Sequence, residues 1–169
     1  MKRRPWLWLA GAGVAAMAGG VGWYLRRNPP VDAEFLWGLR FPRPEGGELV
    51  MADLRGRPLL LNFWATWCAP CVKEMPALDR FQRDHASRGW QVVGLAVDSP
   101  TPVREFLQKT AIGFPIGLAG MEGAEIAEKL GNPMGALPYT VVFDARGRVV
   151  RQKLGITEAQ ELAAWGQQA

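Results

Sequence analysis

The chain has few cysteines and histidines, the side chains that most often form structural zinc sites. Its 169 residues include two cysteines, Cys68 and Cys71, and one histidine, His85. The two cysteines could form half of a zinc site, but structural zinc takes four ligands and the chain offers too few. We therefore expect no metal site, and we expect His85 to be a surface residue on the outer part of a helix.

Acidic residues are absent from the first 27 positions. This segment holds five lysines and arginines, whereas the whole chain has a formal charge of +4, so the rest of the chain carries a net charge of −1. The basic character belongs to the N-terminal segment. The rest of the chain therefore has no excess of positive charge that would indicate nucleic-acid binding.

One uncharged run fills most of that segment. Residues 5–25 are 21 consecutive uncharged, mostly apolar positions, which as a helix would measure about 32 Å and cross a bilayer core. A cleaved signal peptide is the alternative, with Ala16-Met17-Ala18 as the cleavage site, but the run continues beyond it. We predict a signal anchor over residues 1–27, a linker over 28–34 and one globular domain over 35–169.

The predicted domain alternates strand patterns with helix patterns. An early strand at 35–41 and a return at 49–51 predict a hairpin. Further strands are expected at 58–64, 90–97, 114–118, 137–143 and 149–154, and helices from the cysteines to about residue 87, from Thr101 with Pro102 in its first turn, at 122–130, and from Thr157, whose side chain would form a capping box with Gln160. This order predicts an α/β fold with a central mixed β-sheet flanked by helices, an N-terminal β-hairpin and a short central insertion.

The two cysteines stand three residues apart, directly after the buried strand pattern at 58–64. At the start of a helix, residues three apart lie one above the other, so the two thiols can form a disulfide. The unpaired N–H groups and the positive end of the helix dipole stabilise a thiolate there. We predict that Cys68 is the nucleophile, and that Cys71 is shielded and resolves the mixed disulfide.

Three motifs then carry a resemblance to a known family. They are Asn62-Phe63-Trp64-Ala65-Thr66-Trp67-Cys68-Ala69-Pro70-Cys71, Glu74-Met75-Pro76 and Leu137-Pro138-Tyr139-Thr140. With them, the chain from about residue 35 onward resembles the membrane-anchored TlpA/ResA/CcmG group of thiol-disulfide oxidoreductases. This resemblance implies a thioredoxin-like fold and a protein-disulfide reductase.

The resemblance also implies roles for single residues. Cys68 matches the attacking cysteine and Cys71 the resolving one, while Pro138 matches a cis-proline that faces the dithiol. Glu74 matches an acidic residue that tunes cysteine acidity and transfers protons, although it could also be an ordinary first-turn acid favoured by the helix dipole. Asn62 stands where cytosolic thioredoxins have a buried aspartate. The positions expected to contact the substrate are Trp67, Ala69, Pro70, Leu137 and Tyr139.

The function expected from these features is reduction of disulfides in client proteins by an exported, membrane-tethered domain. The clients that the family suggests are apocytochrome c and the copper-site cysteines of cytochrome oxidase, and the expected electron donor is a transmembrane thiol carrier. The predicted location is the bacterial inner membrane, crossed once through residues 5–25, with the catalytic domain in the periplasm. No cofactor beyond the Cys68–Cys71 pair is expected.

Three alternatives stay open. A disulfide-forming oxidant would use the same pair in the other direction. A copper-handling protein would bind the metal through both sulfurs, but Met75, Met121 and Met134, which could assist, are scattered in the sequence. A thiol peroxidase would carry its reactive cysteine without a C-x-x-C partner, so the pair argues against it.

Overall fold

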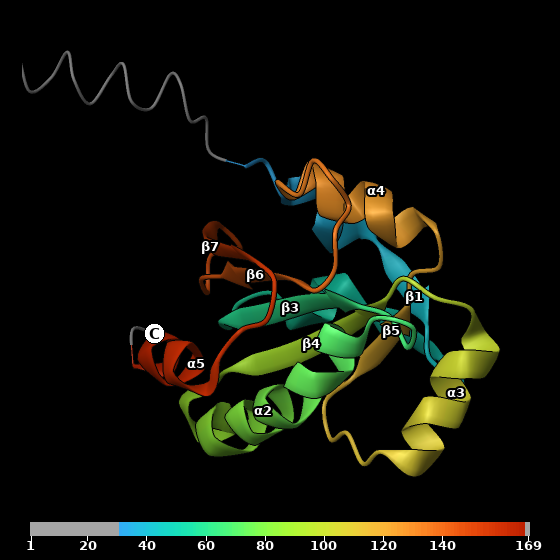
Figure 1. Cartoon of the computed structure of the whole chain (residues 1–169). Coiled ribbons are helices and arrows are strands. Elements are labelled where there is room, and N and C mark those ends of the chain that lie inside the picture. Colours follow the sequence, from blue (N-terminus) through green and yellow to red (C-terminus); the bar gives the residue numbers. More distant parts are fainter. Residues whose placement is uncertain (1–30, 168–169) are drawn as a thin grey trace, which may run out of the picture. The chain divides into compact units, whose positions relative to one another are not determined.

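The computed structural model describes residues 31–167. Its main sheet has five strands in the order β5-β4-β3-β6-β7, and a separate two-stranded hairpin precedes them in the chain. The elements are η1 (Glu34–Gly38), β1 (Arg40–Pro42), β2 (Glu48–Val50), η2 (Met51–Leu54), β3 (Leu59–Trp64), α2 (Ala69–His85), η3 (Ala86–Arg88), β4 (Gln91–Ala96), α3 (Pro100–Lys109), β5 (Ile116–Leu118), α4 (Glu122–Lys129), β6 (Tyr139–Phe143), β7 (Val149–Leu154) and α5 (Ala159–Gly166), where η denotes a 3-10 helix (Figure 1).

The sheet is mixed, as predicted. Strands β3 and β4 run parallel with α2 between them in the chain, and β5 extends this parallel part. Strand β6 pairs antiparallel with β3 on its other side and then with β7 at the edge. A parallel β-α-β unit followed by an antiparallel pair and a helix is the thioredoxin-like arrangement.

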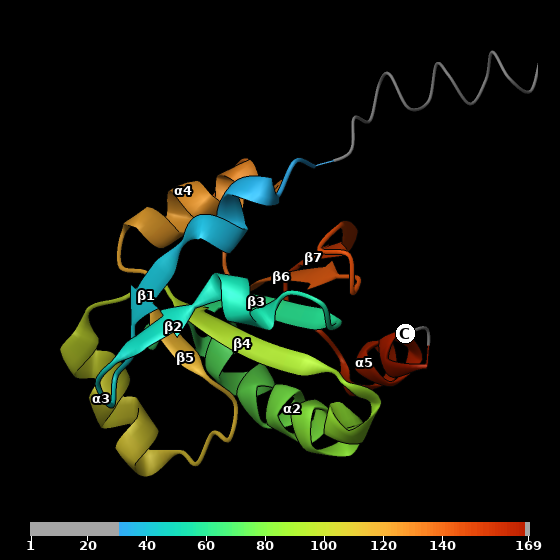
Figure 2. The ribbon, with the colours of Figure 1, turned by 180° about the vertical axis from the view of Figure 1, so that it is seen from behind.

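Both faces of the sheet are covered, which explains the unbroken apolar patterns of β3 and β4. All six residues of each strand are buried, as in parallel strands between two helical layers. Leu60 and Trp64 pack with residues of α2, α3 and α5, whereas Leu61 and Phe63 pack with residues of η1, the hairpin and α4. Figure 2 shows the hairpin on the face opposite α2.

The N-terminal part of the domain differs from the prediction. The predicted strand at 35–41 is shorter, because residues 34–38 form the 3-10 helix η1, while the hairpin itself is confirmed. Leu36 and Trp37 are adjacent and both buried in the same apolar cluster, and a strand would point them to opposite faces. The Asp32 carboxylate accepts a hydrogen bond from Glu34 N–H at the start of this turn.

Two predicted helix starts are also wrong. Helix α3 begins at Pro100 rather than after Thr101, because two prolines fit in a first turn where N–H groups have no helical partner. Helix α5 has Glu158 as its N-cap and forms the capping box with Glu161, not Thr157 with Gln160. The backbone N–H of Thr157 instead donates a hydrogen bond to the buried side chain of Glu74.

None of the helices between residues 31 and 167 is long and apolar enough to cross a membrane. The predicted anchor at residues 5–25 lies outside the described residues.

Candidate active site

The two cysteines lie at the N-terminal end of α2, directly after the loop that follows β3. They form a disulfide with an S–S distance of 1.99 Å. Cys68 is the N-cap of the helix, and its sulfur accepts a hydrogen bond from Cys71 N–H at 3.2 Å, so the sulfur satisfies one of the unpaired donors of the first turn. Cys68 keeps 6% of its surface exposed and Cys71 none. This difference has the direction predicted for a nucleophile and a shielded partner.

Pro138 lies beside the end of β3 that leads to the dithiol. In the antiparallel register Asn62 stands opposite Thr140 and Phe63 opposite Tyr139, so the residue before β6 is next to the end of β3. The Leu137–Pro138 peptide bond is cis, as the family resemblance implies. Leu137 is half-buried and packs against the apolar cluster that contains both cysteines. The Pro138 carbonyl accepts from Gly155 N–H at 2.9 Å, which joins it to the end of β7.

Glu74 lies one turn beyond Cys71 on α2, and residues three apart share a helix face. Its side chain is buried, with 2% of its surface exposed. The Oε1 atom accepts from Asn62 Nδ2 at 2.8 Å, and Oε2 accepts from Thr157 N–H at 2.7 Å. Two buried donors from distant segments therefore fix this carboxyl group.

Two threonines close this arrangement into a ring of hydrogen bonds. Asn62 Nδ2 also donates to Thr140 Oγ1 at 3.0 Å, and the hydroxyl of Thr157 is bonded to Thr140 Oγ1 at 3.3 Å. Glu74, Asn62, Thr140 and Thr157 are all buried, and they come from α2, β3, β6 and the segment before α5. We refer to these four residues as the buried ring.

Burial raises the pKa of Glu74 from 4.5 to about 7, because the ionised carboxylate loses its water. The hydrogen bonds from Thr157 and Asn62 lower this pKa, and the charge of Glu158 raises it by a smaller amount. A carboxyl group with a pKa near neutrality can both accept and release a proton at physiological pH.

The positions expected to contact a substrate divide into two groups. Trp67 is 69% exposed, and Ala69 and Pro70 are also exposed beside the dithiol. Tyr139 is different, because its side chain is 2% exposed and its hydroxyl donates to the Leu130 carbonyl at 2.7 Å. The Tyr139 ring therefore faces the core, and the predicted contact of this residue with the substrate stays a prediction.

Sequence reasoning missed Thr140 and Thr157 as parts of the site. Thr157 resembled a helix N-cap, and Thr140 was part of the Leu137–Thr140 motif but had no role assigned to it. The available signal was the polar residue Asn62 inside an apolar strand: a buried amide needs partners, and its neighbour across the antiparallel pair is Thr140.

The other candidate metal ligands lie apart from one another. Met75 is buried in the same apolar cluster as the cysteines, whereas Met121 and Met134 are exposed. His85 is half-buried at the opposite end of α2 and stacks on Phe81, with 4.5 Å between ring centroids. The predicted surface position of His85 is therefore only partly correct.

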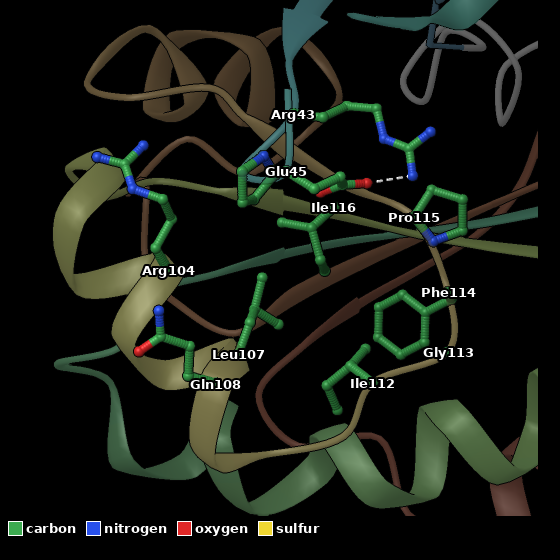
Figure 3. Close-up of a pocket in the computed structure, with 11 residues that line it drawn as sticks. Arg43, Glu45, Arg104, Leu107, Gln108, Ile112, Gly113, Phe114, Pro115 and Ile116 are labelled. Carbon is green, nitrogen blue, oxygen red and sulfur yellow. Dashed lines mark ion pairs between the residues drawn. The ribbon is translucent and has the colours of Figure 1, made fainter. Parts of the chain in front are cut away.

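A cavity of about 480 Å³ lies between the turn of the hairpin, α3 and the segment before β5 (Figure 3). Leu107, Ile112 and Pro115 are among its apolar lining residues, and an ion pair between Arg43 and Glu45 lies along one side. None of the predicted site residues lines it. This cavity is therefore separate from the dithiol site.

Residues 40–164 match the family model of redoxins. The chain belongs to the Redoxin family. This redoxin is 31% identical over 122 residues to the thiol-disulfide oxidoreductase ResA of Bacillus thuringiensis (strain Al Hakam), a match that covers 72% of this chain and 68% of that protein. It is 30% identical over 165 residues to the thioredoxin-like protein YneN of Bacillus subtilis (strain 168), covering 92% of this chain and 94% of that one.

Solved structures support the same grouping. The fold is similar to a thiol:disulfide interchange protein of the thioredoxin family from Chlorobium tepidum TLS, with a TM-score of 0.70 and 26% identity over 78% of this chain and 92% of that one. This redoxin is therefore a thiol-disulfide oxidoreductase of the thioredoxin superfamily, similar to the TlpA/ResA/CcmG group, and it acts on disulfide-containing substrates.

Proposed function

We propose that this redoxin reduces disulfides in exported client proteins, with Cys68 as the nucleophile and Cys71 as the resolving thiol. The observation that carries this proposal is the placement of the pair. Cys68 caps α2 at the surface end of the site, while Cys71 is fully buried one turn before the buried carboxyl of Glu74.

The reaction begins from the dithiol form. The Cys68 thiolate attacks one sulfur of the client disulfide, that S–S bond breaks, and the leaving client thiolate takes up a proton. The Cys71 thiol then loses its proton, with Glu74 as the proposed acceptor, and attacks Cys68 Sγ. The mixed disulfide breaks, the Cys68–Cys71 disulfide forms, and the second client thiolate is released and protonated. Two electrons pass from the enzyme to the client, and no cofactor beyond the cysteine pair is required.

The surroundings of the dithiol suit an extended client segment. Trp67, Ala69 and Pro70 offer exposed surface next to Cys68. Pro138 has no N–H group and lies directly before β6, so a client strand would pair with the backbone that precedes Pro138.

Regeneration and location are part of the proposal. The oxidised pair needs a thiol donor, and the apolar run at residues 5–25 favours a donor in the same membrane. We propose an inner-membrane tether with the domain in the periplasm. The proposed clients are apocytochrome c and the copper-site cysteines of cytochrome oxidase, both of which need reduced thiols.

The roles of the cysteines are tested by trapping. In membranes from the native host, Cys71→Ser should accumulate mixed disulfides through Cys68, which mass spectrometry of the adducts would identify together with the client. Cys68→Ser is the matched control and should trap nothing. Adducts on Cys71 in the control, or none in either variant, would overturn the assignment.

The direction of electron transfer is tested by measuring the reduction potential of the cysteine pair. A reduction potential measured against glutathione should be that of a reductant, and a strongly oxidising value would assign the domain to disulfide formation.

Titration of the reduced protein with copper(I) should show no stoichiometric binding. Tight binding of one ion to the two sulfurs would favour a copper-handling protein.

A further inference from the structure

Asp98 lies two residues beyond the end of β4, next to the loop that precedes the dithiol. Its Oδ2 atom accepts two hydrogen bonds from Thr66, from the backbone N–H at 2.9 Å and from the hydroxyl at 2.5 Å. Its Oδ1 atom accepts from Ser99 N–H at 2.7 Å. One carboxylate thus joins the loops that follow two neighbouring parallel strands.

The loop held in this way is the one that places Cys68. Thr66 stands two residues before Cys68, and Cys68 N–H donates to the Ala65 carbonyl at 3.2 Å across the same turn. The loop is also fixed at its start, where Val97 N–H donates to the Trp64 carbonyl at 2.8 Å. Within residues 31–167, the two bonds to Asp98 are the only hydrogen bonds that hold Thr66.

The position of Cys68 matters because its sulfur has to meet the N-terminal end of α2. The sulfur accepts from Cys71 N–H as an N-cap, and this contact favours the thiolate only while the residue keeps its cap conformation. The backbone of Cys68 is extended here, with φ −92° and ψ 93°. A loop that moves freely would let the residue leave this conformation.

We propose that Asp98 is a positioning residue for the reaction: through its two hydrogen bonds to Thr66 it holds Cys68 at the N-terminus of α2 in the attacking geometry. The proposal rests on the proposed function, in which Cys68 is the nucleophile. Asp98 does not touch the client and acts only through the loop.

Two variants at Asp98 distinguish the effect of its hydrogen bonds to Thr66 from the effect of its charge. Asp98→Asn removes the charge and the bond from Ser99 N–H but keeps an oxygen that can accept both Thr66 bonds, whereas Asp98→Ala removes all three bonds. Asp144→Ala is a matched control, because Asp144 holds the β6–β7 turn by accepting from Arg146 N–H and Arg148 N–H and is not part of the dithiol site.

The test is the rate at which iodoacetamide alkylates Cys68, measured against pH in the reduced full chain carrying Cys71→Ser. Asp98→Ala should lower the rate at neutral pH about tenfold and move the pH profile to higher pH, because a Cys68 that leaves the N-terminus of α2 loses the contacts that stabilise its thiolate. Asp98→Asn should restore at least half of the wild-type rate, and Asp144→Ala should leave the rate unchanged. Thermal unfolding would confirm that all variants are folded at the assay temperature.

Each other outcome overturns the proposal in a recognisable way. Equal losses in Asp98→Ala and Asp98→Asn would show that the charge or the Ser99 bond matters and not the two hydrogen bonds to Thr66. A similar loss in Asp144→Ala would show general loosening of the domain, and wild-type rates in every variant would show no positioning role. An unreactive Cys68 in the parent protein would instead contradict the proposed function itself.

Discussion

Glu74 is the residue at which burial and hydrogen bonding oppose each other most directly. Loss of water raises its pKa to about 7, although two N–H donors favour the ionised form. The group is therefore neutral in the folded protein over a pH range in which it is already ionised in the unfolded chain. Folding stability must depend on pH in that range.

Stability should fall as the pH rises from about 4.5 through about 7, because the unfolded chain releases the Glu74 proton first. The Glu74 contribution is complete below the lower value and is lost above the upper one, a change of about 3 kcal/mol as an upper estimate. Urea unfolding at several pH values should show a smaller decline in Glu74→Gln. An unchanged slope in this variant would contradict the assigned pKa.

The Thr140 hydroxyl links Asn62 to Thr157 in the buried ring, so we expect this hydroxyl to contribute more to stability than the volume of the side chain. Thr140→Val keeps the shape but leaves Asn62 Nδ2 and the Thr157 hydroxyl with one partner fewer. We expect a loss of roughly 1–3 kcal/mol in the free energy of unfolding. Thr101→Val, at an exposed helix position, is the control and should change stability by less than about 0.5 kcal/mol.

At the scale of elements, the hairpin and β5 meet at a glycine. A methyl group on Gly117 would lie 2.9 Å from Leu49 Cδ2, 2.9 Å from Leu95 Cδ2 and 3.0 Å from Phe41 Cβ. These atoms belong to β2, β4 and β1, so the space between hairpin and sheet is already filled.

Gly117→Ala should therefore push the hairpin away from β5 and reduce the free energy of unfolding by roughly 1–3 kcal/mol. Gly38→Ala is the matched control, since nothing lies within 4 Å of the added carbon there. Equal stability of the two variants, measured by urea unfolding, would contradict the close packing at Gly117.

The elements that the sequence predicts well are those with strong local patterns. Strands β3 and β4 and helix α2 were predicted because long apolar or amphipathic runs are bounded by proline and glycine. Residues 35–41 alternate in polarity like a strand, yet burial of the adjacent Leu36 and Trp37 in one cluster favours a 3-10 turn. Only the tertiary structure decides between these two conformations.

The buried ring likewise depends on tertiary contacts that local sequence patterns do not specify. Cys68, Cys71, Glu74 and Pro138 are recognisable from short motifs. The hydrogen bond from Thr157 to Glu74 joins residues 83 positions apart, and no local pattern specifies such a contact. Thr157 could be placed only after α5 and its true N-cap, Glu158, were known.

At the scale of the whole molecule, tethering makes a separate prediction. The full chain should remain with the membrane fraction after an alkaline carbonate wash, because residues 5–25 are long enough to span a bilayer. Replacing residues 1–27 by a cleavable export signal should release the domain into the periplasm. Recovery of the native chain in the soluble fraction would contradict the tether and favour cleavage after Ala18.

Because Thr157 N–H donates to Glu74 Oε2, the chemical shift of this amide proton reports whether Glu74 is ionised. An amide proton bonded to a carboxylate moves downfield in nuclear magnetic resonance spectra when that carboxylate ionises. The Thr157 signal should therefore titrate near pH 7 together with Glu74, whereas amides of β7 should not. Because Thr157 lies on the segment that leads into α5, this one resonance would let the protonation of the active site be followed from a distant part of the chain in each redox state.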